Sequence, residues 1–330
     1  MRDSLRNRVR FLEQQVLEVN HPAIDQPGSV QNLIYKTDDP AIKWIETATS
    51  RIGDWRASER SVFMRWAITI NALHVARDRY RDSPEILLTI DTLRTDAGRT
   101  ERVHLAGWRG DEAARNHEAT IPMMAAYAVQ DMFGILEEIV LELYEIFVRG
   151  NPSILMRGDE YKPLRAAFRA KDDGEAEEAA FTAMWEERIA SWRRNRTFDG
   201  LHRVFGTFWA AAGLVRPSWY RLTDVDDWQR VMETIGEIRH LVTHGEDKVS
   251  KRLGDLCASQ PNLGMTFKEG ERLEVTLQDL WIVEHFVDQL LNAINMSLIE
   301  KAGGPLPPPG RAKPDEGRKP AAKGGGRGAG

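Results

Sequence analysis

The stretch DDWQRVMETIGEIRHLVTHGEDKVSKRL, residues 226–253, has the clearest structural pattern in this chain. Its apolar residues recur at spacings of three and four, which predicts a helix with one stripe facing a core. The stripe is formed by Trp228, Val231, Ile235, Ile238 and Val242. Acidic residues at its start and Gly245 at its end are typical of helix termini. A helix of this kind belongs in a helical bundle.

Periodicity on either side of this stretch predicts further helices and an all-α fold class. The expected helices cover residues 3–19, 41–52, 58–80, 85–93, 122–147, 163–170, 175–194 and 277–299. Proline, glycine and polar residues predict a loop at 21–39 and an irregular segment at 254–274. A connector at 95–119 is expected to hold one short strand, at 102–105.

Composition divides the chain into three parts. Residues 1–119 are expected to form an N-terminal helical region, residues 120–300 an antiparallel helical bundle, and residues 301–330 a disordered tail. The tail has seven Lys and Arg residues against two acidic residues, a net +5, which leaves −10 of the total −5 for residues 1–300. An acidic body argues against broad, charge-driven wrapping of nucleic acid, although a local basic cleft remains compatible with it.

Several protein classes are disfavoured by composition. Cys257 is the single cysteine, so an intrachain disulfide and a cysteine-based zinc site are excluded. The N-terminus is charged and lacks the apolar core of a signal peptide. Carboxylates interrupt the most apolar helix, at 122–147, so a membrane span is not expected. These features predict a cytoplasmic protein without a membrane segment.

Three residues near the end of the central helix carry the strongest chemical signal: Arg239, His240 and His244. About 100° per residue separates Arg239 from His244 by about 140°, and fraying near Gly245 would bring them closer. Arginine offers a charged fork for a phosphate, and histidine gives or takes a proton near neutral pH. The pair is therefore equipped to cleave RNA without a metal or other cofactor, with His244 as base or acid and Arg239 as stabiliser of the transition state.

The segment EIRHLVTHGEDKVSKRL, residues 237–253, resembles the signature of HEPN domains, which are α-helical domains of prokaryotic toxins, antiphage-defence proteins and RNA-processing enzymes. The resemblance covers residues 122–299 in helix order and is sequence-specific over 235–253. It implies a four- to five-helix core, homodimerisation, and metal-independent endoribonuclease activity on an RNA substrate. The family roles fall on Arg239 and His244, and on His240 at a position that often holds asparagine. Residues 1–120 have no counterpart in it.

Other interpretations of these residues stay open. A non-catalytic HEPN-like module for dimerisation, RNA binding or protein binding is the alternative function, and an antitoxin or regulatory protein is a conceivable partner. Arg239 pairing with Glu233, with Glu237 or with a carboxylate of the long acidic helix, and His244 acting as a helix C-terminal cation, would be purely structural. His240 and His244 would suit a metal only with a third ligand such as Glu237 or Asp247.

The end of the helix expected at 175–194 is basic, and the basic residues continue beyond it to Arg203. Together with Lys248, this segment supplies the expected RNA-binding residues Arg193, Arg194 and Arg196. The arginines from Arg188 to Arg203 interleave with aromatic residues, a pattern that suits single-stranded RNA. These aromatic residues are Trp185, Trp192, Phe198 and Phe205. The same pattern also describes a solvated basic face above core aromatics.

Overall fold

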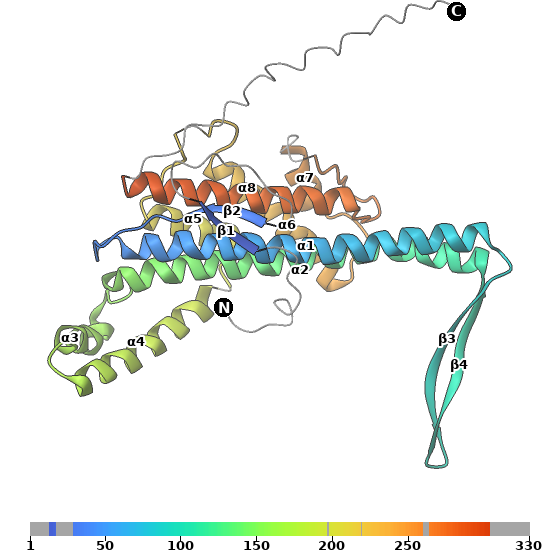
Figure 1. Cartoon of the computed structure of the whole chain (residues 1–330), viewed down its shortest axis with the longest axis horizontal. Coiled ribbons are helices and arrows are strands. Elements are labelled where there is room, and N and C mark those ends of the chain that lie inside the picture. The colour runs from blue at the N-terminus through green and yellow to red at the C-terminus, as the bar shows by residue number, and fades with distance from the viewer. Residues whose placement is uncertain (1–12, 18–28, 197, 219, 260–263, 304–330) are drawn as a thin grey trace, which may run out of the picture.

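The computed structural model describes residues 13–17, 29–196, 198–218, 220–259 and 264–303. The described chain is mostly helical, as expected, but it also contains two small two-stranded sheets. Two long helices, α1 (Lys43–Asp82) and α2 (Gly110–Gly150), pack together along their length, and α8 (Leu277–Lys301) packs against both (Figure 1). The expected disordered tail lies outside the described residues from 304 onward.

Helix α1 is one element of 40 residues, so the expected break between residues 52 and 58 is wrong. The intervening segment contains no proline, and its side chains bind the neighbouring helix. Arg51 Nε donates to Glu142 of α2 at 2.7 Å, and the indole N–H of Trp55 donates to the same carboxylate at 2.5 Å. This packing stabilises the helix across Gly53, whose helix propensity is low.

Residues expected to form a helix at 85–93 instead form a strand. β3 (Leu87–Asp96) pairs in antiparallel register with β4 (Arg99–Arg109), which extends the single strand expected at 102–105. A tight turn at Ala97 and Gly98, both with positive φ, joins the strands. Figure 1 shows this hairpin, called the arm below, projecting from the far end of α1 and α2.

Helix α2 begins at Gly110, twelve residues before the expected start at Pro122, which lies inside the helix. The domain boundary expected between residues 119 and 120 therefore falls within a helix. α2 is also the one helix in the described part of the chain that is long and apolar enough to cross a membrane. In this structure its apolar side chains form the centre of the core, among them Met132, Ile139 and Leu143.

The N-terminal segment differs from the expected helix at 3–19. Of that span, residues 13–17 are described and form β1 (Glu13–Leu17), which pairs in parallel with β2 (Ser29–Leu33). β2 lies in the segment expected to be a loop. It packs beside α1, where the side-chain amide of Asn32 donates to the Thr49 carbonyl at 2.8 Å. Backbone pairing between segments distant in sequence explains why helical periodicity was misleading here.

Shorter elements follow α2. Two 3₁₀ turns, η2 (Pro152–Ile154) and η3 (Asp159–Tyr161), lead to α3 (Lys162–Ala170) and α4 (Glu175–Arg196), both of which confirm the expected helices. α5 (Leu201–Ala211) was not expected. Its buried Phe205 and Phe208 are core residues, so Phe205 does not offer a stacking surface to RNA.

The central helix, α6 (Val225–His244), is confirmed. The Asp224 side chain caps it by accepting a hydrogen bond from the Asp227 backbone N–H at 3.0 Å. The Asp227 side chain in turn accepts one from the Asp224 backbone N–H. α7 (Lys251–Ser259) occupies part of the segment expected to be irregular. α8 confirms the last expected helix, with Thr276 and Asp279 forming its capping box.

A buried polar cluster joins α1 to α8 within the core. Arg56 Nε donates to Asp288 at 2.8 Å, and Arg60 donates to the same carboxylate at 2.7 Å. Glu59 is fully buried between these arginines in sequence, and neither of its carboxyl oxygens has a hydrogen-bond partner among the described residues. Burial raises the pKa of Glu59 well above its usual value, which favours the neutral form of this side chain in the folded protein.

Candidate functional site

Arg239 lies where α6 crosses α2. Its guanidinium carbon is 5.1 Å from the centroid of the Phe133 ring, a distance at which an arginine and an aromatic face attract each other. Gly236, one turn earlier on α6, permits this crossing: a Cβ there would lie 3.3 Å from Phe133 Cε2. The half-buried side chain of Arg239 therefore packs on the buried ring of Phe133.

The donors of Arg239 are unoccupied within the described part of the chain, where its guanidinium makes no hydrogen bond or ion pair. Glu137, one turn beyond Phe133 on α2, is the acidic group that acts on it electrostatically. Burial raises the pKa of Glu137, and the positive charge of Arg239 partly opposes that shift. The pairing of Arg239 with Glu233 or Glu237 that sequence left open is not present, because both carboxylates bind residues elsewhere.

Those carboxylates connect α6 to α7. Arg252 donates to Glu233 at 2.7 Å, and the Ser250 hydroxyl donates to Glu237 at 2.8 Å. Glu233, Glu237, His240 and His244 are spaced by three or four residues and so share one face of α6. The histidines therefore extend the face that contacts α7, while Arg239 lies to the side of it.

His240 and His244 form a ring pair at the end of α6. Their ring centroids are 4.5 Å apart at an interplanar angle of 57°, and both side chains are exposed. Gly245 ends the helix with φ of 70°, and the Glu246 N–H donates to the Leu241 carbonyl at 3.0 Å. Both imidazoles consequently lie at the C-terminal end of the helix.

A third histidine lies near this face. His202 of α5 has a lowered pKa, chiefly because it is partly buried, and the charges of Glu233 and Arg252 act on it from α6 and α7. Its carbonyl accepts from the Gln229 side chain at 2.9 Å, which ties the start of α5 to α6. A lowered pKa keeps this imidazole neutral near pH 7.

The expected RNA-binding arginines are largely engaged within the protein. Arg193 donates to Glu138 at 2.6 Å and to Glu145 at 3.0 Å, and Arg196 donates to Asp199 at 2.7 Å. Arg194 is exposed on the last turn of α4. The segment thus fixes α4 to α2 rather than presenting a row of free cations. Its aromatic residues Trp185 and Trp192 are buried, whereas Phe198 is 87% exposed.

Lys248, the fourth expected RNA-binding residue, follows α6. It is exposed, and its backbone forms an isolated bridge with Arg272. The bridge is reinforced by the Leu273 N–H, which donates to the Asp247 carbonyl at 2.8 Å. This contact fixes the path of the chain after the histidines and brings a second basic residue beside Lys248.

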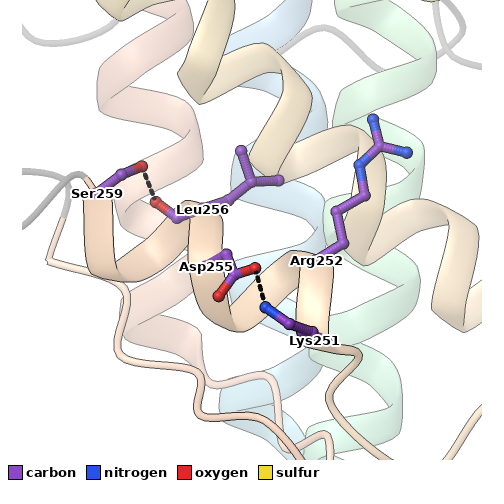
Figure 2. A pocket seen from close by; sticks show the side chains of 5 residues that line it. All are labelled: Lys251, Arg252, Asp255, Leu256 and Ser259. Atoms are coloured by element: carbon purple, nitrogen blue, oxygen red, sulfur yellow. Dashed lines mark hydrogen bonds and ion pairs between the residues drawn. The ribbon is translucent and has the colours of Figure 1, made fainter.

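An open pocket of about 560 Å³ adjoins α7 rather than Arg239. Figure 2 shows its lining residues, Lys251, Arg252, Asp255, Leu256 and Ser259. Lys251 donates to Asp255 at 2.6 Å, so both cations of the lining, Lys251 and Arg252, are paired with carboxylates. The residues of this pocket are not those that sequence predicted.

Sequence reasoning missed Phe133, and it named no residue for the carboxylate of the long acidic helix that acts on Arg239, which is Glu137 of α2. Their i, i+4 spacing places them on one face of α2, but nothing in the sequence indicates which helix covers that face. Among the described residues, no group of three His, Cys, Asp or Glu side chains could hold a metal ion. Neither Glu237 nor Asp247 therefore completes a site with the two histidines.

The chain was compared with family models, curated proteins and solved structures. No family model, no curated protein and no solved structure matches this chain.

Proposed function

We propose that the end of α6 is the active centre of a metal-independent endoribonuclease of the HEPN type, acting as a toxin or antiphage-defence effector in the cytoplasm. The observation that carries this proposal is the guanidinium of Arg239, which lies over the Phe133 ring without a hydrogen bond or ion pair to the described residues, on the same helix end as two exposed histidines. Nearby Arg193, Arg196 and Arg252 are paired with carboxylates. An arginine held in place with its donors free is suited to bind a phosphate.

The reaction would proceed by attack of a ribose 2′-hydroxyl on the adjacent phosphorus. A histidine, His244 with His240 beside it, takes the hydroxyl proton or returns a proton to the leaving 5′-oxygen. Arg239 neutralises the charge that develops on the phosphoryl oxygens. The products would be a 2′,3′-cyclic phosphate and a 5′-hydroxyl, an outcome that distinguishes this chemistry from hydrolysis by an activated water.

The helical core is consistent with such a domain. Helices α2, α4, α5, α6 and α8 would supply the four- to five-helix HEPN-like bundle, and two copies of the chain would pair their Arg239 and His244 residues. α1 and the arm would be additions to it. In this scheme a separate protein, such as an antitoxin, would restrain the nuclease.

The test is RNA cleavage by the full chain in the presence of EDTA. Replacing Arg239 or His244 by alanine should lower the cleavage rate by about a hundredfold or more, the usual effect of removing such a group. Arg230→Ala is the matched control, because Arg230 is an exposed arginine of the same helix that binds Asp227. Cleavage that is unchanged in both Arg239→Ala and His244→Ala would overturn the proposal, as would products with 3′-hydroxyl ends.

A non-catalytic binding module is the second candidate, and the pairing of Arg193 with Glu138 and Glu145 favours it. With these cations occupied and Glu246 and Asp247 following His244, little free positive charge surrounds the site. In that case the chain would bind a partner through the same surface without cleaving RNA. Growth arrest on induced expression that disappears in Arg239→Ala and is accompanied by RNA fragments supports the nuclease; arrest without fragments supports the binding module.

A further inference from the structure

Exposed apolar side chains are concentrated at one end of the molecule. Of thirteen large apolar side chains that are exposed among the described residues, eight belong to the outer halves of α1 and α2 and to the arm. They are Ile68, Val75, Leu87, Ile90, Leu93, Leu105, Met123 and Tyr127. We call this region, residues 68–127, the distal end. Such a concentration of exposed apolar side chains at one end of a molecule is characteristic of an interaction surface.

Beyond its root, the arm lacks support from the other elements that the structure describes. Strands of 10 and 11 residues extend roughly 35 Å at about 3.4 Å per residue. They pack against each other and, at their root, against α2. Figure 1 shows none of the labelled helices beside the remainder of the hairpin. An isolated two-stranded hairpin is marginally stable in water, and a third strand or a packed face is generally needed.

The charge of the distal end argues against a nucleic acid as the molecule that binds there. Residues 68–127 contain eight arginines and nine acidic residues, a net charge of −1, although residues 1–300 together carry −10. Several of these charges are already neutralised in place: Arg77 binds Glu118 at 2.7 Å, Arg115 binds Asp111 at 3.2 Å, and Arg102 binds Asp91. Such a surface does not attract the phosphates of a nucleic acid.

We propose that the distal end binds the distal end of a second copy of this chain. Two copies repel each other through their acidic bodies but not through this nearly neutral end, where charges of both signs alternate with apolar side chains. A two-fold axis would bury the same residues twice, the usual solution for a homodimer. The arms then supply each other with the additional strands or apolar face that a single hairpin lacks.

The proposal is independent of catalysis, since it concerns surface residues remote in sequence from Arg239. Leu93→Glu combined with Leu105→Glu tests it, because these side chains are 71% and 68% exposed and their change leaves the core intact. Leu222→Glu with Val215→Glu is the matched control at 88% and 64% exposure. Sedimentation velocity over a range of concentrations should show, for the unaltered chain and for the control, one association step more than for the arm variant, whether or not two copies also pair at the end of α6.

The arm variant should dissociate with a dissociation constant at least about tenfold higher, equivalent to about 1.4 kcal/mol, while its circular dichroism stays unchanged. A chain that sediments as a monomer at every concentration, or an arm variant that dimerises as tightly as the control, would overturn the proposal. An arm variant that loses RNA binding but not self-association would also overturn it. RNA cleavage that is absent in all variants would leave the dimer result valid and would count only against the nuclease.

A second measurement uses the single native cysteine. Cys257 is 7% exposed and reacts slowly, so Leu93→Cys introduces one accessible thiol. Its maleimide labelling should slow as protein concentration rises, whereas labelling of Leu222→Cys should not. Equal rates for both thiols at all concentrations would contradict burial of Leu93 by a second copy.

Discussion

The guanidinium of Arg239 on α6 rests on the ring of Phe133 on α2, with 5.1 Å between the guanidinium carbon and the ring centroid. A residue on a different helix, more than a hundred positions earlier in the sequence, therefore decides where the proposed phosphate-binding group stands. The relationship makes Phe133 a positioning residue for Arg239.

Replacing Phe133 by leucine should reduce RNA cleavage by roughly 2- to 30-fold, because a cation–π contact of this kind contributes about 0.5–2 kcal/mol. Phe133→Tyr keeps an aromatic face and should retain most of the activity. The measurement is the single-turnover cleavage rate, accompanied by urea unfolding to account for the smaller core residue. Equal rates for the leucine and tyrosine variants would show that the ring does not position Arg239.

Glu59→Gln should change how stability depends on pH. The folded-state pKa of Glu59 is raised, so its favourable contribution is complete below about pH 4.5 and is lost as pH rises toward the folded-state pKa. Glutamine resembles the protonated acid and does not ionise. The variant should therefore match the unaltered protein near pH 4 and exceed it at pH 8 by about 1 kcal/mol or more, the equivalent of one pKa unit.

Urea unfolding at the two pH values measures this difference. The charged groups that act on Glu59 are Arg56 and Arg60 of its own helix and Glu284 and Asp288 of α8. The two arginines favour ionisation and the two carboxylates oppose it. Parallel stability profiles for the variant and the unaltered protein would mean that Glu59 is neither buried nor neutral in solution.

Asp288→Asn should destabilise the fold by about 3–5 kcal/mol, since it leaves two buried or half-buried arginines without their shared carboxylate. Arg56 Nη1 also donates to the Gln31 carbonyl at 2.6 Å, so β2 should loosen together with the α1–α8 contact. Thermal unfolding checks the prediction. Asp255→Asn is the matched control: it removes the exposed pair with Lys251 and should cost less than about 1 kcal/mol.

Gly110→Ala should disrupt the root of the arm. A Cβ at this position would lie 2.6 Å from the Tyr80 carbonyl oxygen and 2.8 Å from Pro84 Cα, and it would also meet the Ser83 carbonyl, all of them backbone atoms that cannot move separately. We expect a loss of about 1–3 kcal/mol, typical of overpacking. At Gly107, in contrast, a Cβ would meet only Leu87 Cδ1 at 3.8 Å, so Gly107→Ala should be nearly neutral in the same unfolding assay.

The sequence predicted best the elements that have both a long apolar stripe and a chemical end signal. α6 and α8 have capping boxes at Asp224 and Thr276, and both helices were predicted with ends within two residues of those observed. The arm was missed because a short apolar run such as Leu87 to Ile90 fits a helix turn and a strand equally well. Its strand state depends on β4, a partner that periodicity within one segment does not reveal.

The candidate site was predictable only in part for a similar reason. Arg239, His240 and His244 stand out because they share the end of one helix, and their spacing is visible in the chain itself. Phe133 and Glu137 are ordinary residues of a core helix until α6 is placed across them. The same applies to Arg193, whose basic segment suggests RNA binding until Glu138 and Glu145 are found beside it.

Gly110, at the root of the arm, and Phe133, whose ring supports Arg239, belong to the same helix, α2. The 23 residue steps from Gly110 to Phe133 span roughly 35 Å at about 1.5 Å per residue, with no loop between them and with Pro122 inside the helix. The root of the arm and the ring beneath Arg239 are therefore joined by helix alone. A partner bound at the distal end would be connected through α2 to the residue that supports Arg239.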